Sequence, residues 1–72
     1  MRAERLVSMA NDIGAFFNAE ADKAVAAQGV ANHIKRFWDP RMRRQIVAYY
    51  RDGGAGLDPV ARSAIALLTT SS

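Results

Sequence analysis

The sequence predicts an all-α protein, a small bundle of about four short helices. Half of its 72 residues are hydrophobic, and they recur at the three- and four-residue spacing of helices rather than alternating as in strands. Two Asp-Pro pairs, Asp39-Pro40 and Asp58-Pro59, mark corners where one helix must end before the next begins. We expect residues 1–72 to form a single domain, since a chain of this length has room for only one.

The first predicted helix runs from about Ala3 to Ala19. Its apolar residues form one face at helical spacing: Leu6, Met9, Ile13, Phe16 and Phe17. Gly14 lowers the local helix propensity by about 1 kcal/mol relative to alanine. We therefore expect another helix to pass close to this glycine, rather than the helix to end there.

The second predicted helix runs from about Lys23 to Phe37, with Asp22 as its N-cap. Its buried stripe is expected to include Val30, Ile34 and Phe37. Three small residues on the same helix would let a neighbouring helix approach closely: Ala26, Ala27 and Gly29.

The third predicted helix begins at the Asp39-Pro40 corner, where Asp39 can cap the free backbone N–H groups. Its apolar positions are Met42, Ile46, Tyr49 and Tyr50. Gly53 and Gly54 are expected to end it, because glycine adopts the left-handed cap conformation without strain.

The fourth predicted helix follows the Asp58-Pro59 corner and is short. Its apolar residues are Val60, Ala64, Ile65, Leu67 and Leu68. We expect residues 69–72 and residues 1–4 to fray at the two ends of the domain.

The composition limits how this small domain can be stabilised. The chain has no cysteine and one histidine, which excludes a disulfide and the usual structural zinc site. Since a core of this size rarely supplies more than roughly 3–5 kcal/mol, we expect a partner protein to add stability. No apolar run reaches the roughly 20 residues of a membrane span, and Glu4 and Asp12 interrupt any signal-peptide pattern. We predict a soluble, cytoplasmic protein that does not bind membranes.

The candidates for catalysis are poor. General acid–base chemistry needs two titratable groups that converge in a pocket. His33 is the only imidazole, and Asp39, its nearest carboxylate in the sequence, lies beyond the predicted helix end. The run Gly53-Gly54-Ala55-Gly56 lacks the lysine and Ser/Thr of a phosphate-binding loop. We predict a non-catalytic protein, with His33 in a structural or interface role and the glycines in a helix cap and turn.

The middle of the chain is basic and aromatic. The formal net charge is only +3, but six Lys and Arg residues lie between Lys35 and Arg51 against Asp39 alone. The eight residues from Phe37 to Arg44 combine two large aromatics, a rigid corner and three arginines. Because Trp and Arg are enriched at binding hot spots, this composition favours a protein interface. We expect Phe37 in the core and leave Trp38 open between core and interface.

A small helical nucleic-acid-binding protein is the alternative, because arginines neutralise phosphates and helix-turn-helix domains have similar sizes. Two features weigh against it: the net charge is low, and Asp39 and a proline precede the third helix where base-reading Asn, Gln or Ser would be expected. A membrane-surface helix fits less well, since the stripe from Met42 to Arg51 is short and half polar-aromatic.

Three stretches carry a resemblance to a known family. They are residues 6–13 followed by Phe16-Phe17, residues 30–43, and residues 53–59. Within the second, the string His-Ile-Lys-Arg-Phe-Trp-Asp-Pro-Arg-Met-Arg is the most specific, because unrelated helical domains seldom place Trp-Asp-Pro-Arg-Met at a helix corner. The chain resembles the delta subunit of cytoplasmic NAD-dependent formate dehydrogenases, which are molybdenum or tungsten enzymes with several subunits. Residues 20–28 depart from the family pattern.

The resemblance implies an accessory subunit that holds no cofactor or metal and belongs to a complex that oxidises formate and reduces NAD. It further implies that the large catalytic (alpha) subunit carries bis-molybdopterin guanine dinucleotide and iron–sulfur clusters, and that other subunits carry iron–sulfur clusters and FMN. We hypothesise that the chain docks on the large subunit and stabilises it or helps it to acquire or keep its cofactor. The expected partner-binding residues surround the first Asp-Pro corner: His33, Arg36, Phe37, Trp38, Asp39, Arg41, Met42, Arg43 and Arg44.

Overall fold

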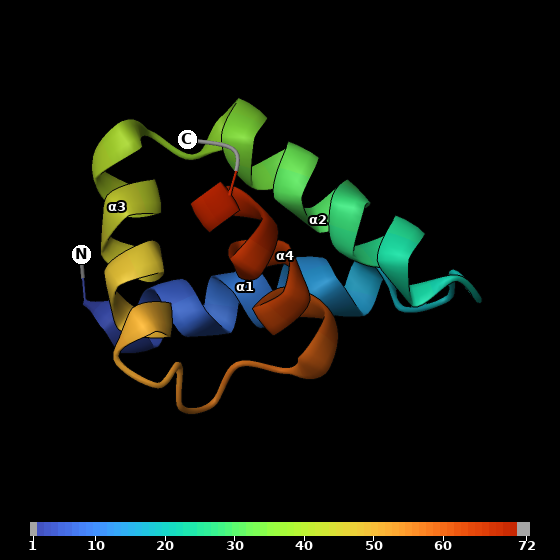
Figure 1. The fold of residues 1–72 in the computed structure, drawn as a ribbon, viewed down its shortest axis with the longest axis horizontal. Helices are drawn as coiled ribbons and strands as arrows, with labels where there is room; N and C mark the ends of the chain where they lie inside the picture. Colours follow the sequence, from blue (N-terminus) through green and yellow to red (C-terminus); the bar gives the residue numbers. More distant parts are fainter. Residues whose placement is uncertain (1, 71–72) are drawn as a thin grey trace.

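Four α-helices make up the computed structural model, which describes residues 2–70 and contains no strand in that range (Figure 1). They are α1 (Ala3–Phe17), α2 (Lys23–Phe37), α3 (Pro40–Arg51) and α4 (Pro59–Thr70). The predicted fold class is confirmed, and α2 has the predicted bounds. Residues 3, 4, 69 and 70, where we expected fraying, are helical, whereas residues 1, 71 and 72 lie outside the described range. None of the four helices combines the length and apolar character that crossing a membrane requires.

Helix α4 occupies the centre of the molecule and contacts the other three helices, most extensively α2 (Figure 1). Two small residues in α4, Ala61 and Ala64, are fully buried and allow the neighbouring helices to pack close to α4. Gly14 of α1 is also buried, and a Cβ added to it would lie 3.5 Å from the backbone nitrogen of Ala61. The predicted close passage of a helix at Gly14 is therefore confirmed.

One apolar core lies between the helices. The largest fully buried side chains come from all four of them: Leu6, Val30, Ile34, Ile46 and Ile65. Removing an aliphatic side chain of this kind from water contributes roughly 1.5–3 kcal/mol. Among the described residues, no buried side chain is polar or charged.

The apolar face predicted for α1 is partly wrong. Leu6 is buried and Met9, Ile13 and Phe17 pack partly against the core, but Phe16 is 81% exposed. Phe16 follows the buried Val7 by nine residues, which is two and a half helical turns, so the two side chains point in opposite directions.

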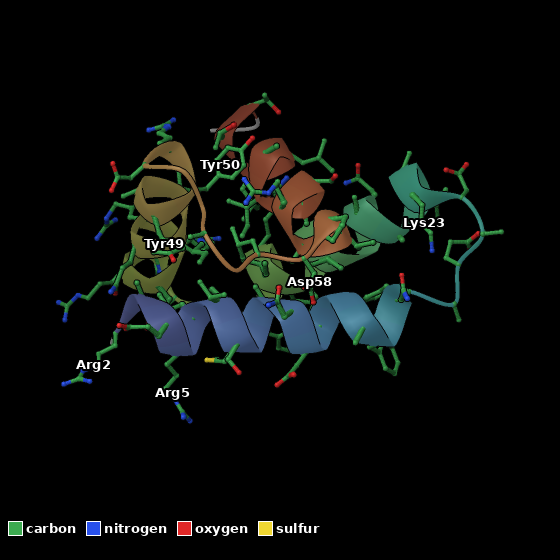
Figure 2. The ribbon with its side chains drawn as sticks, turned by 90° about the horizontal axis from the view of Figure 1, so that it is seen from below. Arg2, Arg5, Lys23, Tyr49, Tyr50 and Asp58 are labelled. Atoms are coloured by element: carbon green, nitrogen blue, oxygen red, sulfur yellow. The ribbon has the colours of Figure 1, made fainter. Side chains whose placement is uncertain are left out.

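The turn between α1 and α2 is closed by two side chains at the start of α2. Asp22 accepts hydrogen bonds from the backbone N–H groups of Ala24 and Val25 at 3.0 and 3.4 Å, which confirms the predicted N-cap. The Lys23 ammonium donates to the carbonyl oxygens of Asn18 at 3.0 Å and Glu20 at 3.3 Å. The ammonium group of Lys23 thus satisfies the carbonyl of Asn18, the C-cap of α1, and one carbonyl of the turn. Figure 2 shows where Lys23 lies.

Three glycines shape the loop between α3 and α4. Gly53, Gly54 and Gly56 have φ values of 114°, 64° and 87°, a region that residues with a Cβ rarely adopt. Helix α3 ends at Arg51, and Gly53 and Gly54 follow its C-cap residue Asp52, so their conformations confirm the predicted helix cap and turn at this position.

Side chains from three helices fix this loop to the bundle. Asn11 of α1 donates to the Gly56 carbonyl and accepts from the Asp58 N–H, both at 2.9 Å. The Tyr49 hydroxyl donates to the Ala55 carbonyl at 2.6 Å, and the Arg62 guanidinium donates to the carbonyls of Gly53 and Gly54 at 3.1 and 2.7 Å. Figure 2 shows Tyr49 and Asp58 on the side of the loop that faces α1. These hydrogen bonds hold the loop against α1, α3 and α4.

Candidate partner-binding surface

The corner between α2 and α3 is a rigid element because both helix ends are capped. The Trp38 N–H still donates to the Ile34 carbonyl at 3.0 Å, and the backbone then becomes extended at Trp38 and Asp39. The Asp39 carboxylate accepts from the Met42 N–H at 2.9 Å, while Pro40 occupies the first position of α3. The predicted N-cap at Asp39 is confirmed, and the side chains on either side of it are held in fixed directions.

The two aromatic residues of the corner are placed differently from what we expected. Phe37, predicted to lie in the core, is 67% exposed, so that prediction is wrong. Trp38 is only 6% exposed and belongs to the same apolar cluster as Ile34 and Ile46. The physical reason is the backbone: α2 ends at Phe37, and the extended conformation of Trp38 directs the larger ring inward. Trp38 thus supports the corner from beneath, which revises its expected place at the contact surface.

An aromatic and cationic group surrounds the exposed Phe37. The His33 ring lies one helical turn earlier, with its centroid 4.7 Å from that of Phe37 and the planes tilted by 43°. The guanidinium carbon of Arg36 lies 5.7 Å from the Phe37 ring centroid, within reach of a cation–π interaction. These contacts hold an apolar ring at the surface beside a fixed positive charge. Such a ring gains most from burial when another molecule covers it.

The arginines of α3 extend the charge beyond the corner. Arg41 and Arg44 are exposed, whereas Arg43 and Met42 are half-buried. Arg43 donates to the Lys35 carbonyl at 3.0 Å, which ties the start of α3 to the end of α2. Five of the nine expected partner-binding residues are hereafter called the corner surface: His33, Arg36, Phe37, Arg41 and Arg44.

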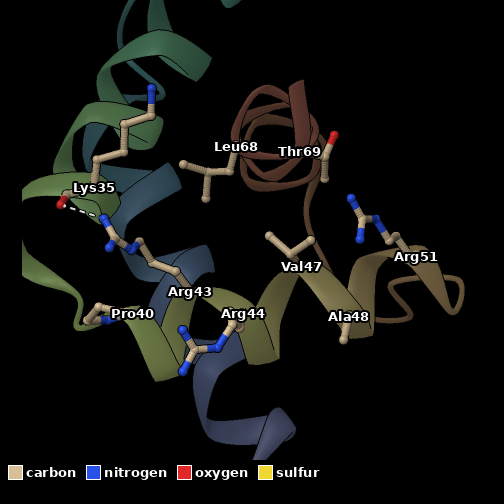
Figure 3. Close-up of a pocket in the computed structure, with 9 residues that line it drawn as sticks. All are labelled: Lys35, Pro40, Arg43, Arg44, Val47, Ala48, Arg51, Leu68 and Thr69. Atoms are coloured by element: carbon tan, nitrogen blue, oxygen red, sulfur yellow. Dashed lines mark hydrogen bonds between the residues drawn. The ribbon is translucent and has the colours of Figure 1, made fainter. Parts of the chain in front are cut away.

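A cavity of about 750 Å³ opens next to the corner surface, between the end of α2, α3 and the end of α4 (Figure 3). Its lining combines cationic and apolar side chains: Lys35, Pro40, Arg43, Arg44, Val47, Ala48, Arg51, Leu68 and Thr69. This cavity was not predicted from the sequence. The spacing of Arg44, Val47 and Arg51 indicates that they share one face of a helix, which is the α3 side of the cavity. The place of Leu68 in the lining depends on how α4 packs, which the spacing does not show.

No arrangement of metal ligands accompanies these surfaces. Among the described residues, no group of three or more His, Cys, Asp or Glu side chains lies close enough together to hold a metal ion. The chain contains no cysteine for an iron–sulfur cluster. The residues present therefore do not fit the metal and iron–sulfur cofactors that the resemblance assigns to other subunits.

Comparison with known proteins decides which family the sequence represents. The family model described as NADH-dependent formate dehydrogenase delta subunit FdsD matches residues 5–65. The chain belongs to this family. The match to the FdsD model spans all of α2 and α3 together with the corner surface and the loop that leads to α4. No curated protein and no solved structure matches the chain.

Proposed function

We propose that this chain is the non-catalytic accessory subunit of a cytoplasmic NADH-dependent formate dehydrogenase, and that it binds and stabilises the large, molybdopterin-containing alpha subunit. The complex would also contain subunits that carry flavin and iron–sulfur clusters. The FdsD family match supports membership in the complex. The corner surface supports the binding role, because it holds Phe37 exposed beside Arg36 on a rigid corner.

In this proposal the exposed side chains of the corner surface contact the alpha subunit, and Trp38, Asp39 and Met42 position them. Arginine suits such a contact since its guanidinium forks to carboxylates or carbonyl groups. Burial of the exposed part of Phe37 supplies apolar stabilisation, and Arg36 and Arg41 provide direction and specificity. Covering this surface also stabilises the small domain itself by mass action.

Co-purification tests the proposal with two matched double variants. Phe37→Ser with Arg41→Ser removes an exposed phenylalanine and an exposed arginine from the corner. Phe16→Ser with Arg5→Ser removes the same two residue types from the outer face of α1, where Phe16 is 81% exposed. Figure 2 shows Arg5 pointing away from the bundle. Each affinity-tagged variant is expressed with the other subunits, and the bound alpha subunit is quantified.

We expect the corner variant to retain about 30-fold less alpha subunit, the effect of losing one hot spot of about 2 kcal/mol. The α1 variant should retain as much as the wild type. Both variants should keep the free energy of unfolding within about 1 kcal/mol of the wild type, since the replaced side chains are exposed. Release of the alpha subunit by the α1 variant alone would show that the docking surface is elsewhere.

A second measurement addresses the cofactor of the alpha subunit. If this chain helps the alpha subunit to acquire or keep its cofactor, alpha subunit purified from cells that lack the chain should contain less molybdenum or tungsten per mole. Equal metal content with and without the chain would limit the role to stabilisation of the protein.

A further inference from the structure

The cavity beside the corner surface has cationic side chains on two sides and apolar side chains between them, an arrangement that the proposed docking role does not explain. In Figure 3, Val47 and Leu68 face each other across its centre, Lys35 and Arg43 lie on one side, and Arg51 lies on the other. Lys35 and Arg51 are exposed, and the hydrogen bond from Arg43 to the Lys35 carbonyl fixes the first side. None of the described residues that line the cavity is acidic.

We propose that this cavity binds an acidic amphipathic segment of a companion subunit, with apolar side chains at its centre and carboxylates at its two ends. Charge complementarity identifies this occupant, because the cavity presents cations on both sides and no carboxylate of its own. A helix meets the requirement when its acidic residues lie about one turn to either side of its apolar ones, since residues three and four apart share a face.

The apolar part of the lining favours a protein over a nucleic acid. The apolar side chains of the lining are Pro40, Val47, Ala48 and Leu68, and Val47 and Leu68 lie between the cationic sides (Figure 3). A phosphate backbone offers charge alone, so it would leave these apolar side chains uncovered. An amphipathic segment satisfies both parts of the lining, and burying its apolar side chains against Val47 adds stabilisation that salt does not screen.

This inference rests on the proposed function, because it takes the acidic segment to belong to a subunit of the same complex. The test uses Lys35→Glu with Arg51→Glu, which reverses one cation on each side of the cavity and leaves the corner surface intact. The control is Arg2→Glu with Arg5→Glu, which makes the same change in charge on the outer side of α1 (Figure 2). Far-UV circular dichroism of each purified chain verifies that it remains helical.

We expect the Lys35→Glu, Arg51→Glu chain to recover about tenfold less of its companion subunit than the control does at physiological salt, since two favourable ion pairs become repulsive. A photo-crosslinking amino acid placed at the exposed Ala48 of the tagged chain, within the complex, identifies the occupant. The crosslinked peptide should contain acidic residues on both sides of apolar ones.

Three results would overturn the inference. Equal recovery with the cavity variant and its control would show that the cavity is not a docking site, and the proposed function would stand if the corner variant still lost the alpha subunit. Crosslinks from Ala48 to nucleic acid, or to a segment without carboxylates, would refute the acidic partner. If the wild-type chain recovered no subunit at all, the proposed function itself would fail.

Discussion

Replacement of Trp38 by alanine tests whether this ring is part of the core or part of the surface. Trp38 is 6% exposed, and a buried aromatic side chain covers roughly 150–250 Å². At about 25 cal/mol per Å² this area corresponds to about 4–6 kcal/mol. Compact unfolded chains already bury part of their apolar area, which lowers the figure to about 3–5 kcal/mol. That value agrees with the usual cost of replacing a core tryptophan by alanine.

The consequence for the isolated chain is severe. A core of this size supplies roughly 3–5 kcal/mol in total, so Trp38→Ala should leave the chain largely unfolded at 25 °C. Phe37→Ala is the matched control, because Phe37 is adjacent in sequence but 67% exposed. It should cost no more than about 1 kcal/mol. Urea unfolding followed by far-UV circular dichroism measures both variants.

The wild-type chain offers an independent check, since Trp38 is its only tryptophan. Acrylamide should quench the fluorescence of the native chain far less than that of the urea-unfolded chain. Equal quenching in the two states, or a Trp38→Ala variant within about 1 kcal/mol of the wild type, would refute the burial of this ring.

Three further predictions concern the caps, the loop and the close helix contacts. Asp39→Ala should lower the free energy of unfolding by about 1 kcal/mol, whereas Asp39→Asn should retain most of it; equal losses would contradict a cap role. Asn11→Ala should cost about 0.5–1.5 kcal/mol and speed amide exchange at residues 56–58, because it removes the side-chain partner of the loop groups; unchanged exchange would show that Asn11 does not hold the loop. Gly14→Ala should stabilise the chain by up to about 1 kcal/mol in urea unfolding, since its Cβ would make ordinary contacts at 3.5 Å and beyond. Gly29→Ala should destabilise it by about 1–3 kcal/mol, because its Cβ would lie 2.6 Å from the Phe17 ring, and the reverse order of the two glycine variants would contradict the packing of α1.

The sequence predicted the helix ends well, because the signals there are local. Asp22 caps α2, and the Asp39-Pro40 pair ends α2 and begins α3, so the predicted and observed bounds of α2 agree. Capping and the backbone restriction by proline act over three or four residues, whatever the rest of the chain does. The end of α1 was predicted at about Ala19 but lies at Phe17, because no comparable stop signal follows Phe17 and the Lys23 side chain closes the turn from the next helix.

The aromatic residues were harder to place, because their burial depends on how the helices pack. Periodicity put Phe16 and Phe37 in the core, yet both are exposed, while Trp38 beyond the end of α2 is buried. Phe16 lies on the far side of α1 from Val7, and the extended backbone at Trp38 turns the ring inward. At the end of a helix, a hydrophobic pattern identifies the buried face only approximately. A change in the backbone dihedral angles there can bury one side chain in place of its neighbour.

The candidate site was predictable only in part for the same reason. The corner was found because its residues are contiguous, from Phe37 to Arg44. The cavity was missed because it joins Lys35, Val47 and Leu68 from three helices, and no local pattern indicates that α4 packs beside α3. Its cationic side chains were predicted as a basic block, but their arrangement on both sides of Val47 and Leu68 depends on the tertiary structure (Figure 3).

Hydroxyl-radical footprinting of Phe37 tests the central claim most directly, because it asks whether a companion subunit covers this ring. Phe37 should be oxidised readily in the isolated chain, where it is 67% exposed, and should be strongly protected in the assembled formate dehydrogenase complex. Phe16, on the outer face of α1, provides the internal reference and should be oxidised equally in both. Equal oxidation of Phe37 in the free chain and in the complex would contradict docking through the corner surface.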